Sequence, residues 1–177
     1  MIPGFHETPS GSWNSQSFTG YGEVGYEALF GSFSATPFAG LEYSTLWSNS
    51  FTENNRGAPS VIGLSYASTT VDTLPSYLGA QLEEKTNFAQ VGVDAWIRAA
   101  WQHEFDLGRW TNSSFISAPG FNFTIQGAEP PRDALVTSIG AKLTITKNVA
   151  VFGTFEGQFG EGGGNSIGGT GGLVFTW

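Results

Sequence analysis

Apolar and polar residues alternate with a period of two along most of this chain, and the clearest example is Val149–Gly160. In this segment Val151 and Phe155 fall on one face, whereas Thr154 and Glu156 fall on the other. Successive side chains of a β-strand point to opposite faces of the sheet. The pattern therefore predicts a strand with one apolar face and one polar face.

The same alternation recurs in six further segments, and helical periodicity is nearly absent. These segments are Phe18–Leu29, Thr36–Trp47, Val71–Glu84, Gln90–Phe105, Asp133–Thr146 and, approximately, Ser166–Trp177. Each is long enough for a tilted strand to cross a membrane, which takes about 9–11 residues. The sequence therefore predicts an all-β fold with about seven membrane-length strands.

Two features leave details of these strands open. Ser60–Tyr66 and Phe121–Gln126 keep partial β character, so the strand count is open by about one or two. Pro75 stands inside Val71–Glu84, where its missing N–H would weaken the ladder of hydrogen bonds. We expect an irregularity there, near the loop end of the strand.

The connections between the predicted strands alternate in length. The short ones are Gly31–Ala35, Lys85–Ala89 and Lys147–Asn148; the mostly longer ones, which are richer in Gly, Pro, Asn and Ser, are Ser48–Thr70, Asp106–Arg132 and Glu161–Asn165. Outer-membrane barrels have short periplasmic turns and long extracellular loops. The pattern predicts an antiparallel transmembrane β-barrel of the bacterial outer membrane, with a periplasmic C-terminus and extracellular long loops.

Composition agrees with a barrel and excludes several other classes. Charged residues make up 12% of the chain, against about 25% in ordinary soluble domains. Glycine (25 residues) and aromatic residues (15%) are abundant. The net charge of −8 and only seven basic residues argue against nucleic acid as a partner. Cysteine is absent, which excludes disulfides and thiolate metal sites.

Two features predict that this chain is part of a longer protein. Met1–Gly11 has neither the basic nor the apolar region of a secretory signal, so we expect an export signal upstream. An odd strand count also disagrees with the even number usual in bacterial single-chain barrels, which suggests that N-terminal strands are missing. We expect the isolated chain not to form a stable closed monomer, because open sheet edges are costly in lipid.

Charged residues gather at positions that alternation assigns to the inside of the barrel. They are Glu23, Glu27, Glu42, Arg98, Glu104, Lys142 and Glu156. One interpretation is a polar lumen that accommodates a translocating chain or a plug helix. The other is internal ion pairing, with Arg98 and Lys142 as partners of the acids, that stabilises a solvated barrel interior.

No pattern in the sequence predicts a catalytic, cofactor-binding or metal site. His103 and Glu104 are adjacent in a predicted strand, so their side chains should point to opposite faces and cannot easily act together. Two histidines without cysteine make a zinc site improbable. The GxSxG elbow, the P-loop and the dinucleotide fingerprint are also absent.

Several stretches together resemble one family, the autotransporter β-domain, which is the translocator of type V secretion. They are TPFAGLEYS (Thr36–Ser44), LSYASTTVDTLPSYLGAQL (Leu64–Leu82), AWQHEF (Ala100–Phe105) and FTIQGAEPPRDALVTSIGAKL (Phe123–Leu143). Their order and spacing make the resemblance fairly specific. It covers roughly Phe18–Trp177, so we expect a barrel domain at 18–177 preceded by a loop or linker at 1–17.

The resemblance implies that this chain is the C-terminal part of a twelve-stranded barrel, without the plug helix and the covalently linked passenger of such proteins. The last eight residues resemble the family's barrel-assembly signal, with Thr170, Gly172, Phe175 and Trp177 at the matching positions. The resemblance implies that the barrel-assembly machinery recognises this strand, and that outer-membrane lipid surrounds the barrel.

Three functions remain open from the sequence. The first is a translocator that anchors a passenger and assists its passage to the cell surface. The second is an independent small barrel that acts as a pore or a surface adhesin through its long loops. The third is a soluble β-rich binding module, against which the nearly uncharged outward faces of the strands argue.

Overall fold

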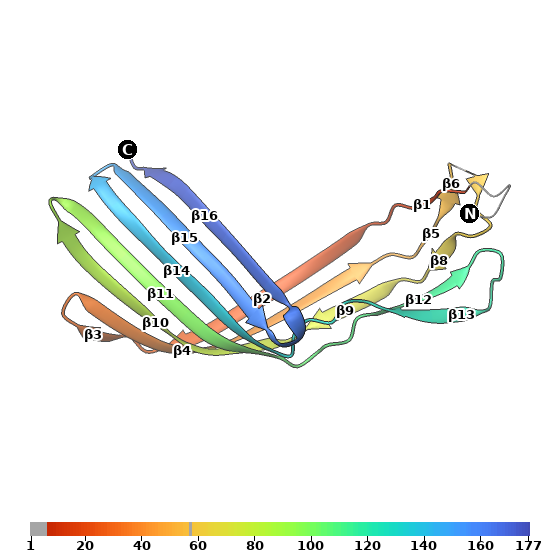
Figure 1. Cartoon of the computed structure of the whole chain (residues 1–177), viewed down its shortest axis with the longest axis horizontal. Helices are drawn as coiled ribbons and strands as arrows, with labels where there is room; N and C mark the ends of the chain where they lie inside the picture. Colours follow the sequence, from red (N-terminus) through yellow and green to blue (C-terminus); the bar gives the residue numbers. More distant parts are fainter. Residues whose placement is uncertain (1–6, 57) are drawn as a thin grey trace. The chain divides into compact units, whose positions relative to one another are not determined.

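A computed structural model describes residues 7–56 and 58–177, and its elements are β-strands apart from one short 3₁₀ turn. Seven long strands dominate, as the alternation predicts (Figure 1). They are β2 (Ser15–Gly25), β4 (Phe33–Ser48), β10 (Pro75–Phe88), β11 (Val91–Glu104), β14 (Asp133–Thr146), β15 (Val149–Gly160) and β16 (Asn165–Phe175). The all-β antiparallel fold predicted from the sequence is confirmed.

The residues form two compact units, and β2 and β4 contribute to both. The first unit comprises Met1–Gly20, Tyr43–Thr73 and Asp106–Glu129. The second unit comprises Tyr21–Glu42, Leu74–Phe105 and Pro130–Trp177.

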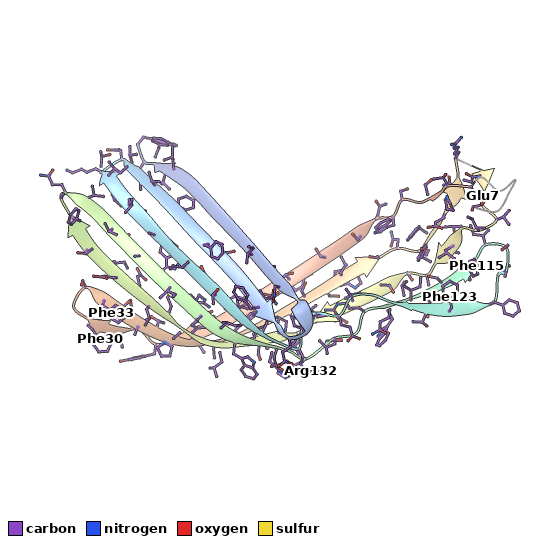
Figure 2. All side chains as sticks on the ribbon, viewed as in Figure 1. Glu7, Phe30, Phe33, Phe115, Phe123 and Arg132 are labelled. Carbon is purple, nitrogen blue, oxygen red and sulfur yellow. The ribbon has the colours of Figure 1, made fainter. Side chains whose placement is uncertain are left out.

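The second unit is built on a curled sheet in the form of a half-barrel. Its strands follow the order β16-β15-β14-β11-β10-β4-β2, so β2 and β16 are its edges among the described residues. The short strand β3 (Ala28–Phe30) also pairs with β4, and the 3₁₀ turn η1 (Glu161–Gly163) connects β15 to β16. Near β3 the rings of Phe30 and Phe33 lie 6.4 Å apart (Figure 2).

The first unit consists mostly of short strands. They are β1 (Pro9–Ser10), β5 (Phe51–Thr52), β6 (Asn54–Asn55), β7 (Ala58–Pro59), β8 (Leu64–Tyr66), β9 (Thr69–Thr73), β12 (Trp110–Phe115) and β13 (Asn122–Gln126). They form a sheet in the order β13-β12-β8-β5 and another in the order β1-β6-β7, while β9 pairs with β4. Phe115 and Phe123 pack between β12 and β13 with ring centroids 5.5 Å apart (Figure 2).

Two predicted strands are interrupted in the structure. The segment Val71–Glu84 divides into β9 and β10, and Pro75 is the first residue of β10. The start of a strand tolerates proline because its missing N–H leaves no gap within the ladder. The segment Phe18–Leu29 likewise divides into β2 and β3.

The turn between β10 and β11 is shorter than the Lys85–Ala89 connection expected from the sequence. β10 continues to Phe88, and only Ala89 and Gln90 separate it from β11. Both residues have positive φ, at 47° and 73°. Two such residues are what a type I′ turn requires, and this turn matches the twist of the paired strands. Neither is the Gly, Asn or Asp by which such turns are usually recognised in a sequence.

Aromatic side chains cover glycines on neighbouring strands of the second unit. Trp96 on β11 is in register with Gly140 on β14, and a Cβ atom at Gly140 would overlap the Trp96 indole. Phe152 on β15 is in register with Gly172 on β16, where a Cβ would lie 2.7 Å from its ring. A ring over a cross-strand glycine fills the space that a missing side chain leaves, and it helps to pin the register.

We predict that Gly140→Ala destabilises the folded protein by about 1–3 kcal/mol, because the new methyl group must displace the Trp96 indole from a well-packed position. The control is Gly153→Ala on β15, where no heavy atom lies within 4 Å of the added Cβ. Urea titration of the natural protein in lipid vesicles, read by heat-modifiable gel migration, measures both variants. Equal stability of the two variants would contradict the assigned packing.

Candidate functional site

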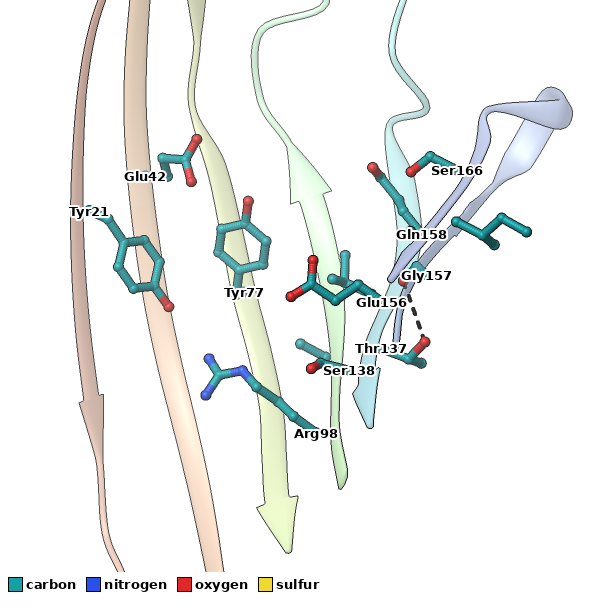
Figure 3. Close-up of a pocket in the computed structure, with 14 residues that line it drawn as sticks. Tyr21, Glu42, Tyr77, Arg98, Thr137, Ser138, Glu156, Gly157, Gln158 and Ser166 are labelled. Carbon is teal, nitrogen blue, oxygen red and sulfur yellow. Dashed lines mark hydrogen bonds between the residues drawn. The ribbon is translucent and has the colours of Figure 1, made fainter. Parts of the chain in front are cut away.

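One face of the curled sheet in the second unit carries a cavity of about 670 Å³ (Figure 3). We call this side of the sheet the cavity face. All seven long strands contribute polar residues to its lining, among them Tyr21 on β2, Glu42 on β4, Tyr77 on β10, Arg98 on β11, Ser138 on β14, Glu156 and Gln158 on β15, and Ser166 on β16. Alternation along each strand brings these side chains, which are far apart in sequence, to the same side of the sheet.

Arg98 is the centre of a network on the cavity face. Its guanidinium forms an ion pair with Glu23, and Nη1 donates to Glu23 Oε1 at 3.3 Å. The Tyr21 hydroxyl donates to the same carboxylate. The Arg98 guanidinium carbon also lies 3.5 Å from the ring centroid of Phe38, a cation–π arrangement. The network therefore ties β2 and β4 to β11 across β10.

Glu42 and Glu156, two of the other charged residues singled out from the sequence, line the same cavity. Lys142 lines a second hollow of about 440 Å³ on the cavity face, together with Glu83 and Asp94. The structure thus places Glu42, Arg98, Lys142 and Glu156 in the lining of these two hollows, and Glu23 is paired with Arg98.

Glu27 and Glu104 lie elsewhere. Glu27 is exposed in the link between β2 and β3, outside the long strands. Glu104 is only 3% exposed at the end of β11. Its carboxylate accepts a hydrogen bond from the backbone N–H of Leu74 at 2.8 Å. Glu104 therefore secures the chain where β10 begins, a structural role that the alternation pattern does not indicate.

His103 and its neighbour Glu104 have different partners. His103 Nδ1 lies 2.8 Å from Asp133 Oδ1, which also accepts a hydrogen bond from the indole N–H of Trp101 at 2.9 Å. This pairing links β11 to β14. The arrangement does not bring His103 and Glu104 together as an acid–base pair.

The cavity face also carries uncharged polar residues that were not singled out from the sequence. Tyr21 and Tyr77 line the cavity, and Gln81 lies 3.5 Å from Arg98. Gln158 donates to Gln102 at 3.3 Å. Each lies an even number of positions from a charged residue of the same strand. Alternation therefore places it on the same face as that residue, and could have identified it from the sequence.

The opposite face of this sheet is apolar and exposed. Leu78, Trp101, Leu135 and Phe159 are in register across β10, β11, β14 and β15, with exposed fractions between 43% and 60%. Leu82, Ile97, Ile139 and Phe155 form a second such row. Within the described part of the chain, no large side chain is fully buried. Exposed apolar rows of this kind indicate a surface that water does not cover.

The four residues of the expected assembly signal lie on or next to the edge strand. Thr170, Gly172 and Phe175 belong to β16, and Trp177 follows its end. Phe175 is in register with Val149 of β15, and its side chain is largely exposed, as is that of Trp177.

Two other features are absent from the described residues, a membrane-spanning helix and a metal-binding cluster. No helix among residues 7–56 and 58–177 is long and apolar enough to cross a membrane. The same residues contain no group of three or more His, Cys, Asp or Glu side chains placed to hold a metal ion.

We predict a coupling energy of up to about 1 kcal/mol between Arg98 and Glu23, because both side chains are about one-third exposed and water screens their attraction. A double-mutant cycle with Arg98→Gln and Glu23→Gln, measured by urea titration in lipid vesicles, tests it. The pair Lys85–Glu83 at 2.7 Å, in which the Lys85 side chain is 65% exposed, is the control and should show a smaller coupling. Additive effects of the two substitutions at Arg98 and Glu23 would contradict the pairing.

The family model of the autotransporter β-domain matches residues 1–156. The matched region includes β2, β4, β10, β11, β14 and most of β15, and it ends before β16. No curated protein matches the chain.

Proposed function

The chain belongs to the autotransporter β-domain family, and on this premise we propose that it anchors a passenger segment in the outer membrane and assists its passage to the cell surface. Proteins of this family are located in the bacterial outer membrane and have a translocator role. The family is not an enzyme family. The observation that carries the proposal is one sheet with a polar, hollowed face and an apolar, exposed face.

The dimensions of the strands support a membrane-spanning position. The seven long strands have 11 to 16 residues each. A tilted crossing takes about 9–11 residues. The rows that contain Leu78 and Leu82 would then contact lipid, and the cavity face would line a hydrated interior.

Closure of the barrel requires further strands. Neighbours in the sheet run antiparallel, so β2 and β16, at the two ends of a seven-strand path, point the same way. A fully antiparallel barrel must therefore place an odd number of strands between β16 and β2. Five additional strands from an upstream segment would complete the twelve that the family resemblance implies, and they would satisfy the open edges.

The turns support one orientation. The two-residue connections at Ala89–Gln90 and Lys147–Asn148 join strands at one end of the sheet of the second unit. Periplasmic turns are short in outer-membrane barrels, whereas extracellular loops are long. We assign these turns and the C-terminus to the periplasm, and the long connections Ser48–Thr70 and Asp106–Arg132 to the outside.

Three partners follow from this arrangement. Outer-membrane lipid would cover the apolar face, and the passenger segment would pass along the cavity face beside Arg98 and Glu156. The barrel-assembly machinery would recognise β16 through Thr170, Gly172, Phe175 and Trp177. The exposed edge of β16 supports this assignment, because an unpaired strand is open to pairing with another chain.

We predict that the isolated 177-residue chain does not refold in detergent into a compact monomer that shifts its gel migration on boiling. The reason is the two open edges, whose unpaired backbone groups each cost several kcal/mol in an apolar medium. Gel migration and far-UV circular dichroism measure the outcome. A closed heat-modifiable monomer would instead favour an independent pore or adhesin, and folding without detergent would favour a soluble module.

Translocation itself is tested with a reporter. We expect an epitope inserted before this chain in the natural protein to become accessible to protease on intact bacteria, because the barrel carries the preceding segment outward. A reporter that remains protected while the barrel folds normally would refute the translocator function.

Substitutions in the two edge strands test the role of the terminal strand in assembly. The double substitution Phe175→Ala and Trp177→Ala should lower both the folded barrel and the displayed reporter, since assembly precedes display. The substitution Val24→Ala on the opposite edge strand, at a side chain 75% exposed, should change neither strongly.

A further inference from the structure

Three aromatic rings from separate segments of the first unit form a stacked column. The ring of Trp13 lies 5.2 Å from that of Phe51 at an interplanar angle of 21°. Phe51 lies in turn 4.4 Å from Tyr66 at 12°. The outer ring, Trp13, is 60% exposed. The column therefore offers a large aromatic surface to a ligand, and this surface has no part in the membrane-spanning sheet.

Backbone pairing holds the column in place. Phe51 of β5 is in register with Tyr66 of β8, which sets the inner stack. The backbone N–H of Asn49 donates to the carbonyl of Asn14 at 3.1 Å, which holds the segment that carries Trp13. Pairing of β1 with β6 fixes the residues that precede Trp13. The surface is thus formed before any ligand arrives, which lowers the entropy cost of binding.

Glu7 also anchors the N-terminal segment of this unit. Its carboxylate accepts hydrogen bonds from the Ser60 hydroxyl at 2.6 Å and from the Val61 N–H at 2.9 Å. The Ser60 hydrogen bond is the main reason that the pKa of Glu7 lies below its usual value. The carboxylate is therefore ionised at neutral pH, where it can accept the hydrogen bonds from Ser60 and Val61.

A cavity of about 460 Å³ includes the three rings in its wall. This volume lies in the range of small-molecule sites, about 300–1,000 Å³. The rest of the polar lining consists of hydroxyl and amide groups and one carboxylate: Ser10, Ser48, Asn49, Thr69, Thr111 and Glu53. Among these described lining residues there is no Lys or Arg.

Glu53 and Tyr66 form a fixed polar pair in the wall. Glu53 Oε2 accepts the Leu64 backbone N–H at 2.9 Å. Burial, followed by the nearby Glu53 carboxylate, raises the pKa of Tyr66. The Tyr66 hydroxyl therefore stays protonated at neutral pH, and it can both donate and accept a hydrogen bond.

We propose that this cavity binds a neutral saccharide. One side of a sugar ring presents C–H groups that pack on an aromatic face, and its edge presents hydroxyls that both donate and accept hydrogen bonds. Trp13 supplies the aromatic face, and Asn49, Thr111 and Glu53 supply matching polar groups. An anionic ligand meets the Glu53 carboxylate without a compensating cation, and a purely aromatic ligand leaves the polar wall unpaired.

The proposal is independent of passenger translocation, because binding is measured on the folded protein. Outer-membrane vesicles from bacteria that carry the natural gene are titrated with galactose, glucose, mannose, N-acetylglucosamine, the anionic N-acetylneuraminic acid, and indole. Saturation-transfer NMR reports binding of each. We expect at least one neutral sugar to bind with a millimolar Kd, more tightly than the anionic sugar or indole.

Substitutions locate the site. Trp13→Ala should weaken sugar binding by about tenfold, since a stacked aromatic contact contributes up to about 1.5 kcal/mol. Trp13→Phe should retain part of the binding. The matched control is Trp110→Ala, which removes another tryptophan of the same unit that is 55% exposed and lies outside the cavity lining. Heat-modifiable migration verifies that each variant is folded.

Three results would overturn the proposal: no transfer to any of the four neutral sugars, tighter binding of indole or N-acetylneuraminic acid than of every neutral sugar, or equal sugar binding in the Trp13→Ala variant and the natural protein. Loss of reporter display with intact sugar binding would instead refute only the translocator function. The two proposals therefore fail separately.

Discussion

The structure of the second unit depends on pairing of the backbone. An unpaired N–H or C=O group in hydrocarbon costs several kcal/mol, so a chain that crosses a membrane as strands must pair each strand on both sides. Long strands in continuous register meet this demand through most of the sheet, as in the fourteen residue pairs that join β10 to β11. The edges β2 and β16 are the exceptions among the described residues. Because these edges also need partners in lipid, the proposed barrel requires further strands to close.

Because backbone pairing holds the sheet together, its side chains do not need to form a buried core. The described residues include no large, fully buried side chain, so burial in a protein core contributes little to this sheet. Its apolar side chains, such as Ile97 and Ile139, are exposed instead, and in the proposed arrangement lipid would stabilise them. On the cavity face, aromatic rings pack on glycines and Arg98 pairs with Glu23, so these contacts serve mainly to hold neighbouring strands in register.

The extent to which the sequence predicts this structure follows from the range of the interactions involved. Alternation is local, and it predicted β14 and β15 with their observed bounds. The irregularity expected at Pro75 is confirmed as a break at Leu74, where β9 ends and β10 begins. The Ala89–Gln90 turn was missed because its residues are not those usual for positive φ. Alternation along the strands assigned Arg98 and Glu23 to the same face. Their contact could not be predicted, because it joins residues 75 positions apart and depends on the register of four strands.

The aromatic column of the first unit shows the limit of pattern reasoning most clearly. Trp13, Phe51 and Tyr66 have no regular spacing, and Phe51 and Tyr66 lie in strands of only two and three residues. Their stacking depends on β-pairing within connections between the predicted long strands, where only Ser60–Tyr66 showed partial β character in the sequence. Segments outside the hydrocarbon can leave backbone groups to water, so they are free to adopt short, irregular strands. In the proposed arrangement these segments lie outside the hydrocarbon, where this freedom permits a preformed ligand surface, whereas strands that cross the membrane must keep strict alternation.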